Sequence, residues 1–189
     1  LTIAIPQFVS LLIIKNMFQA EGIFNLMLRN WHVIDLLQNW GVLEANQISV
    51  PFWSDPMYAR VLVIILNLWV GIPYTIMQVT GILQNIPADL YEAARIDGAN
   101  AAQQFINITL PYMIFVMTPT IIGSFTGNIN NFNVIYLLSG GGPTINAGDT
   151  AGKTDLLITW LYKLSVDQRN YNIAAVIGIL TFVVLAIVS

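Results

Sequence analysis

Residues 86–111 read IPADLYEAARIDGANAAQQFINITLP and form a polar island between two long uncharged stretches. No Asp, Glu, Lys or Arg occurs from Val61 to Ala88 or from Gly98 to Gly148, and a third uncharged run extends from Asn170 to Ser189. Each run can hold a helix of about 20 residues that crosses a bilayer. The sequence therefore predicts an all-α, polytopic membrane helix bundle.

The composition excludes several other classes of protein. Of the 189 residues, 56% are hydrophobic and only 9% are charged, against about 25% charged residues in a soluble domain. A net charge of -3 offers no basic surface for nucleic acid. With no Cys and a single His, His32, the chain has almost nothing from which to build a metal centre or a catalytic triad. We expect neither here, and we expect His32 to lie on the surface at the membrane interface.

Four spans of alternating direction are predicted, and they are Leu1–Phe18, Met57–Leu83, Tyr112–Leu138 and Tyr171–Ser189. We expect further spans in a longer protein, because the first and last runs stop in mid-pattern. Segments 21–56 and 139–170 then lie on one side of the membrane, and segment 84–111 lies on the other. Together, residues 1–189 are expected to be part of a single transmembrane domain.

Two amphipathic stretches are predicted on the side opposite the island. Phe24–Trp40 alternates apolar and polar residues at helical spacing and carries two tryptophans, which is typical of a helix at the membrane interface. Gly140–Pro143 is a turn or loop. Thr154 is predicted to cap a second amphipathic helix, Leu156–Leu164.

The island itself predicts a short helix, a turn and a second short helix. Pro87 suits the first helical position, Glu92 lies near the positive end of the helix, and Gly98 can adopt the left-handed conformation that ends it. The second helix is expected to run into Leu110-Pro111 at the membrane boundary. Small residues leave a bare face for close packing with another protein, and they are Ala93, Ala94 and Ala99.

The spacing of the island resembles a known signature. It reads Glu92-Ala93-Ala94, three residues, Gly98, nine residues, Ile108, one residue and Leu110-Pro111, as in the signature loop of the permease subunits of bacterial ABC importers. The rest of the chain is closest to the larger permease subunit of maltose and maltodextrin importers. The stretches that carry this resemblance are residues 6–10, 53–56, 67–74, 86–98, 128–132, 141–143 and 154–157.

The resemblance implies a topology and a set of partners. It places the 84–111 loop in the cytoplasm, docked in a cleft of an ATPase subunit with Glu92 paired to a basic residue, whereas the Lys/Arg count alone would put this loop outside. It further implies a second permease subunit, two copies of the ATPase, an extracytoplasmic sugar-binding protein near Leu156–Leu164, and a bacterial plasma membrane location. ATP and Mg would be bound by the ATPase, since this chain has no G-x-x-x-x-G-K-[ST] loop and needs no cofactor of its own.

Polar residues inside two predicted spans indicate a substrate site. Asn67, Gly71, Tyr74 and Gln78 are spaced to share one helix face, as are Ser124, Gly127/Asn128 and Asn131. Amides are costly in hydrocarbon, so both faces should point inward, in the outer half of the membrane. Uncharged amides together with an aromatic ring suit a neutral, hydroxyl-rich solute.

In the permeases that this chain resembles, sugar contacts fall on the positions of Asn67, Gly71, Tyr74, Asn128 and Asn131. Gly127 stands where that family can carry an aromatic sugar platform, which leaves the exact sugar open. The run from Asn128 to Asn133 has poor helix propensity, so we expect local unwinding there. Hydrogen bonding between helices of the bundle is the alternative role for these asparagines.

These features favour a permease subunit of an ATP-driven maltodextrin importer over three alternatives. An importer of another neutral sugar or a polyol is the nearest. A secondary transporter would need intramembrane charges for ion coupling, and the uncharged runs argue against it. A membrane-embedded enzyme would need a set of His, Asp or Glu at membrane depth, and the sequence provides none.

Overall fold

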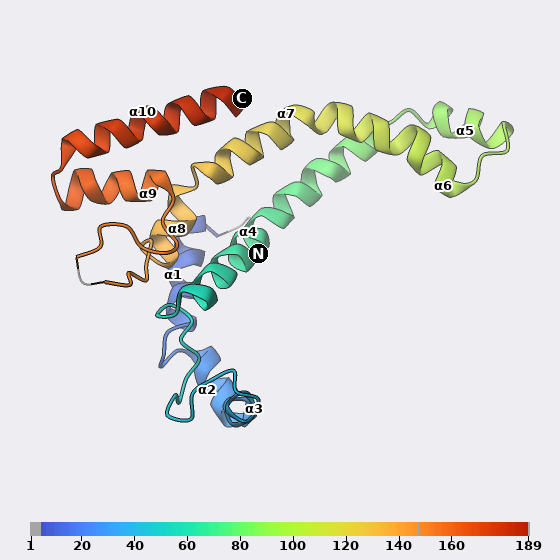
Figure 1. Ribbon diagram of the computed structural model, residues 1–189. Coiled ribbons are helices and arrows are strands. Elements are labelled where there is room, and N and C mark those ends of the chain that lie inside the picture. Colours follow the sequence, from blue (N-terminus) through green and yellow to red (C-terminus); the bar gives the residue numbers. More distant parts are fainter. Residues whose placement is uncertain (1–4, 147, 189) are drawn as a thin grey trace.

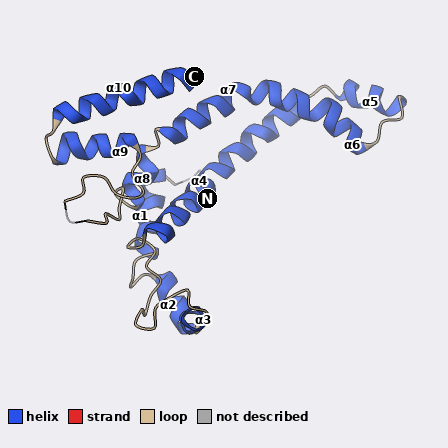
Figure 2. Cartoon of the chain, in the orientation of Figure 1, coloured by secondary structure: helices blue, strands red, loops and turns tan. Residues whose placement is uncertain are grey.

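The computed structural model describes residues 5–146 and 148–188, and the regular structure within these ranges is entirely helical (Figure 2). In chain order the helices are α1 (Gln7–Met17), α2 (Ile23–Asn30), α3 (Val33–Asn39), α4 (Pro56–Gln84), α5 (Ala88–Ile96), α6 (Ala101–Gln104), η1 (Phe105–Thr109), α7 (Leu110–Ile129), α8 (Phe132–Leu138), α9 (Leu157–Tyr162), η2 (Lys163–Asp167) and α10 (Tyr171–Val188). The expected all-α class is confirmed.

Three helical stretches are long and apolar enough to cross a membrane, and they are α4, the stretch Ala101–Leu138 and α10. They correspond to the second, third and fourth predicted spans. Within the first predicted span, residues 1–4 lie outside the described part, and the helix in the remainder is α1, which has 11 residues. Figure 1 shows α4 and α7 converging toward one end of the molecule, with α5 and α6 projecting beyond that end.

Helix α4 begins where its capping chemistry predicts. The Asp55 carboxylate accepts hydrogen bonds from the backbone N–H groups of Met57 (2.8 Å) and Tyr58 (3.2 Å), and Pro56 occupies the first turn. From there the helix extends to Gln84 through the uncharged run, with Pro73 inside it. The predicted bounds are therefore correct to within one residue at each end.

The third stretch is interrupted at the asparagines that predicted unwinding. Helix α7 ends at Ile129, and Asn130 and Asn131 leave the helical region with ψ angles of 31° and 81°. The Asn131 side chain then accepts a hydrogen bond from the backbone N–H of Val134 (3.3 Å) and caps α8. The second helix of the island runs into Leu110-Pro111 as predicted, and it continues into the third stretch, because α6, η1 and α7 follow one another without a gap.

Two local predictions were wrong. The helix expected over Phe24–Trp40 is split into α2 and α3 at His32, which has a left-handed φ of 56° and shares a 2.9 Å hydrogen bond with Asp35 in the first turn of α3. Thr154 does not cap a helix, since α9 begins only at Leu157. The Thr154 hydroxyl instead donates a hydrogen bond to Gly142 O (2.6 Å), in the Gly140–Pro143 loop.

The main core lies where α1, α4 and α8 meet, on the side of the molecule away from α5 and α6. Its buried residues are Leu11, Leu62, Val63, Leu66, Val134, Ile135 and Leu138. Close by, the buried Asn25 donates to Gln19 O and Val50 O and accepts from Val50 N, which anchors segment 21–56 to the end of α1. Because α4 and α8 share the main core, the α8 end of the helix break is held against α4.

Candidate functional site

A chain of three asparagines joins α4 to the helix break. Asn67 Nδ2 donates to Asn128 Oδ1 (2.8 Å), and Asn131 Nδ2 donates to Asn67 Oδ1 (3.0 Å). Asn128 Nδ2 in turn donates to the backbone oxygen of Ser124 (2.8 Å). Three of the five predicted substrate residues, from sequence positions far apart, are therefore in direct contact.

These amides border a hollow of about 440 Å³ that is open to the surroundings. Asn67, Gly71, Tyr74 and Asn128 line it, and the Tyr74 side chain is half exposed. Its lining residues include no Asp, Glu, Lys, Arg or His. The hollow thus offers amide and hydroxyl groups and one aromatic ring, but no charge.

Further residues complete the lining, and sequence reasoning found only some of them. Gln78 and Ser124 were expected on the inward faces and do line the hollow. Gln7 from α1 and Thr75 from α4 were missed. Helical periodicity could have indicated Thr75, which lies four positions after Gly71 and eight after Asn67, but no pattern in the sequence places α1 beside α4.

Two predicted positions stand apart from this hollow. Asn131 does not line the hollow. Its side-chain oxygen caps α8, and its nitrogen donates to Asn67, which does line it. Gly127 lines a different hollow together with Gly123, Thr126, Asn130 and Leu185 of α10. An aromatic side chain at Gly127 would therefore begin on the α10 side of α7, not beside Asn67.

The island forms a projecting helix that ends in a glycine turn. Gly98 has φ of +79°, and the N–H groups of Gly98 and Ala99 bond to the carbonyls of Arg95 (3.0 Å) and Ala94 (2.8 Å), as in a Schellman motif. Asn100 and Gln103 then form a capping box that starts α6. The left-handed stop predicted at Gly98 is confirmed. Helix α5 begins one residue later than predicted, with Pro87 as its N-cap.

The motif residues of the island are mostly exposed. Glu92 and Ala93 are exposed and Ala94 is half-buried, while Ile96 at the end of α5 is 87% exposed. No residue of α5 is buried. A helix that buries so little of itself has an accessible surface for another protein.

Ile108, Leu110 and Pro111 lie where α6 passes into α7, at the π-helical turn η1. Leu110 N bonds to Phe105 O, five residues back. Pro111 has no N–H to donate, and its ring would clash with the carbonyl of Asn107 in a regular helix. The wider turn relieves that clash, so the Leu-Pro of the motif accounts for η1.

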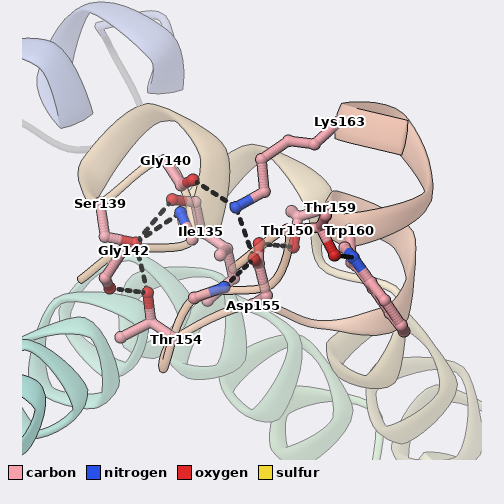
Figure 3. Close-up of polar contacts among 12 residues, drawn as sticks. Ile135, Ser139, Gly140, Gly142, Thr150, Thr154, Asp155, Thr159, Trp160 and Lys163 are labelled. Carbon is pink, nitrogen blue, oxygen red and sulfur yellow. Dashed lines mark hydrogen bonds and ion pairs between the residues drawn. The ribbon is translucent and has the colours of Figure 1, made fainter. Parts of the chain in front are cut away.

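A polar network holds the loops at the other end of the molecule (Figure 3). The largely buried Asp155 carboxylate forms an ion pair with Lys163, accepts from Thr159 Oγ1 (2.9 Å), and accepts from Gly152 N (2.7 Å). Lys163 Nζ also donates to Gly140 O (3.2 Å). The loop after α8 is thereby tied to α9 and η2.

This close approach requires glycine in the loop. At Gly141, which has φ of +81°, a Cβ atom would lie within 1.8 Å of Asp155 Oδ1.

The described residues include no group of three His, Cys, Asp or Glu side chains that could hold a metal ion.

Comparison with known proteins assigns a family to this architecture. Residues 1–189 match the model of the family described as "Binding-protein-dependent transport system inner membrane component". Among curated proteins, the galactooligosaccharides transport system permease protein GanP of Bacillus subtilis (strain 168) is 42% identical over 178 residues, which is 94% of this chain and 39% of GanP. The maltodextrin permease MalC of Streptococcus pneumoniae serotype 4 is 38% identical over 188 residues, covering 98% of this chain and 42% of MalC. The chain thus spans about two fifths of the length of these relatives.

Among solved structures, a bacterial ABC transporter involved in the import of the acidic polysaccharide alginate has the same fold. Its TM-score is 0.67 at 24% identity, over 96% of this chain and 57% of that one. The alginate transporter in complex with its alginate pentasaccharide-bound periplasmic protein gives a TM-score of 0.65 at 25% identity, with the same coverage. The match extends over nearly all of the helices described above.

Proposed function

The chain belongs to the family of binding-protein-dependent transport system inner membrane components, and from this membership we propose that it is a permease subunit of an ATP-driven oligosaccharide importer. The observation that carries the proposal is the uncharged hollow beside Asn67, Tyr74 and Asn128. Amide groups and a half-exposed aromatic ring match the hydroxyls and the apolar face of a sugar. A charged solute would need an opposite charge that this lining does not contain.

The substrate that we propose is a maltodextrin-type oligosaccharide. Maltodextrin and maltose permeases are 38–40% identical to this chain, and Asn67, Gly71, Tyr74, Asn128 and Asn131 would supply the contacts. A galactooligosaccharide is the second candidate, because GanP is 42% identical over 94% of the chain. Both sugars are neutral, so the chemistry of the hollow suits each of them.

We further propose that α5 and the turn at Gly98 are cytoplasmic and dock on an ATPase subunit. The exposed Glu92 would pair with a cation of that subunit, and segments 21–56 and 139–170 would face the opposite side. The complex would contain a second permease subunit, two ATPase subunits that bind ATP and Mg, and an extracytoplasmic sugar-binding protein near α9. This chain would provide the pathway and the docking helix and would itself hydrolyse no ATP.

The test is reconstitution of the full-length protein with its neighbouring transport subunits. ATPase should copurify with it, and proteoliposomes supplied with the binding protein should take up radiolabelled maltotriose when ATP is added. Uptake of radiolabelled maltotriose but not of radiolabelled galactotriose identifies a maltodextrin importer, and the reverse identifies the second candidate. Absence of a copurifying ATPase, or uptake of a labelled alginate oligosaccharide and of neither neutral sugar, would contradict the proposal.

A further inference from the structure

A hydrogen bond ties the projecting helix to the base of α7. The hydroxyl oxygens of Tyr91 on α5 and Thr109, the last residue of η1, lie 2.8 Å apart and form a hydrogen bond in which either hydroxyl can donate. Thr109 is 8% exposed, in a part of the molecule where most side chains are exposed. Among the described residues, this is the only hydrogen bond or ion pair that joins α5 to the continuous helical segment 101–129.

The bond matters because α5 has little else to hold it. None of its residues is buried, so apolar packing does not fix its direction relative to α7. The chain connects α5 to α6 through the turn at Gly98, which follows the C-terminal end of α5. Tyr91, in the first half of α5, supplies a cross-link that the backbone does not provide.

Thr109 lies at the point where α7 can be redirected. Residues 105–109 form the π-helical turn, in which the usual hydrogen-bond ladder is interrupted next to Pro111. Helix α7 then continues to Ile129 and carries Asn128 at its other end. Its 20 residues form a lever of about 30 Å. A small rotation at η1 therefore becomes a larger displacement at the asparagine chain.

We infer that Tyr91 is a positioning residue that transmits movement of α5 through Thr109 to α7 and thereby to Asn128. The inference rests on the proposed function, because the movement of α5 is supplied by the ATPase. Tyr91 touches neither sugar nor nucleotide in this scheme. It fixes the angle between the docking helix and the helix that borders the hollow.

Conservative variants in the reconstituted complex test this role. Tyr91→Phe and Thr109→Val each remove one hydroxyl and keep the shape of the side chain. Either should lower the maximal rate of maltotriose uptake about fivefold, the factor that corresponds to the net stabilisation of one typical hydrogen bond, and should leave the KM for the loaded binding protein unchanged. ATPase should remain bound, and hydrolysis should continue with fewer sugars imported per ATP. The double variant should be no slower than either single variant.

Thr118→Val is the matched control, because the Thr118 hydroxyl donates to Ile114 O within α7 itself. It should transport as the unaltered complex does. Normal uptake by Tyr91→Phe and Thr109→Val, or effects that add in the double variant, would overturn the inference. Loss of bound ATPase from these variants would also overturn it, since the hydroxyl would then serve docking. Failure of the unaltered complex to bind ATPase would instead contradict the proposed function.

Discussion

Asn67 on α4 is bonded at once to both sides of the break between α7 and α8. Its nitrogen donates to Asn128 in the last turn of α7 (2.8 Å), and its oxygen accepts from Asn131, which caps α8 (3.0 Å). A single amide therefore joins α4 to the point at which the neighbouring helix is interrupted. Each of these bonds uses one of the two N–H groups and one of the two lone pairs of the amide, so a sugar can bond Asn67 without displacing either partner. A sugar bonded there would contact the same amide that joins the two sides of the break.

Replacing Asn67 by Leu should abolish maltotriose uptake. The substitution keeps the approximate volume but leaves the Asn128 oxygen and the Asn131 nitrogen without partners, at a cost of about 1–3 kcal/mol for each group that stays desolvated. Uptake into proteoliposomes and the melting temperature of the purified complex measure the two effects. Asn133→Leu, at an exposed position on α8, is the control and should affect neither. Dissociation of the Asn67→Leu complex would favour a purely structural role for the amide.

Asn131 combines two roles that different substitutions separate. Asn131→Ser keeps a capping oxygen for α8 and removes the amide that donates to Asn67, whereas Asn131→Ala removes both. Both variants should therefore lose uptake, and the Ala variant should be less stable by about 1 kcal/mol because the helix cap is lost. Thermal unfolding and maltotriose uptake distinguish the two roles. Normal uptake by Asn131→Ser would mean that only the cap matters.

Several features followed from the sequence because local chemistry determines them. Uncharged runs placed α4 and α10, Asp55-Pro56 set the start of α4, and the asparagine run set the break at Asn130–Asn131. Period and spacing also placed Asn67, Gly71 and Tyr74 on one face, which borders a single hollow. Each of these predictions depends on residues within a few turns of one another.

The predictions that were wrong or incomplete depend on contacts between distant segments. Thr154 has the local sequence of a helix cap, but its hydroxyl bonds to Gly142 and Ser139 on a loop 12 to 15 residues away. Gln7 lines the hollow because α1 packs near α4, which helical periodicity does not encode. The division of the helix at His32 depends on a single backbone conformation, which the amphipathic pattern on either side conceals.

Lys163→Met should destabilise the loops around α9. The side chains of Asp155 and Lys163 are 4% and 17% exposed, and removing one partner of a buried ion pair costs about 3–5 kcal/mol. A lower melting temperature and weaker binding of the sugar-binding protein are expected, because the Gly140–Pro143 loop loses its tie to η2. Lys153→Met, at an exposed position, is the control. Unchanged stability of Lys163→Met would mean that water solvates the Asp155 carboxylate and that the ion pair contributes little to stability.

Substitutions at Gly98 should separate backbone geometry from charge at the docking helix. A Cβ atom at Gly98 would meet no atom within 4 Å, so only its φ of +79° restricts the side chain. The left-handed region costs an ordinary residue about 1–2 kcal/mol, a β-branched one more, and Asn little. Gly98→Val should therefore release the ATPase, while Gly98→Asn should retain it.

Glu92→Ala provides the comparison, because it removes the charge and leaves the turn in place. It should weaken sugar-stimulated ATP hydrolysis and still retain part of the ATPase, since the exposed surface around Ile96 remains. The amount of ATPase that copurifies with each variant gives the order, with Gly98→Val lowest, Glu92→Ala intermediate and Gly98→Asn highest. Gly81→Ala, at a helical glycine of α4 that also has open space around it, should match the unaltered protein. Equal retention by Gly98→Val and Gly98→Asn would show that the shape of this turn does not govern docking, and the cytoplasmic assignment of residues 84–111 would then have to rest on other grounds.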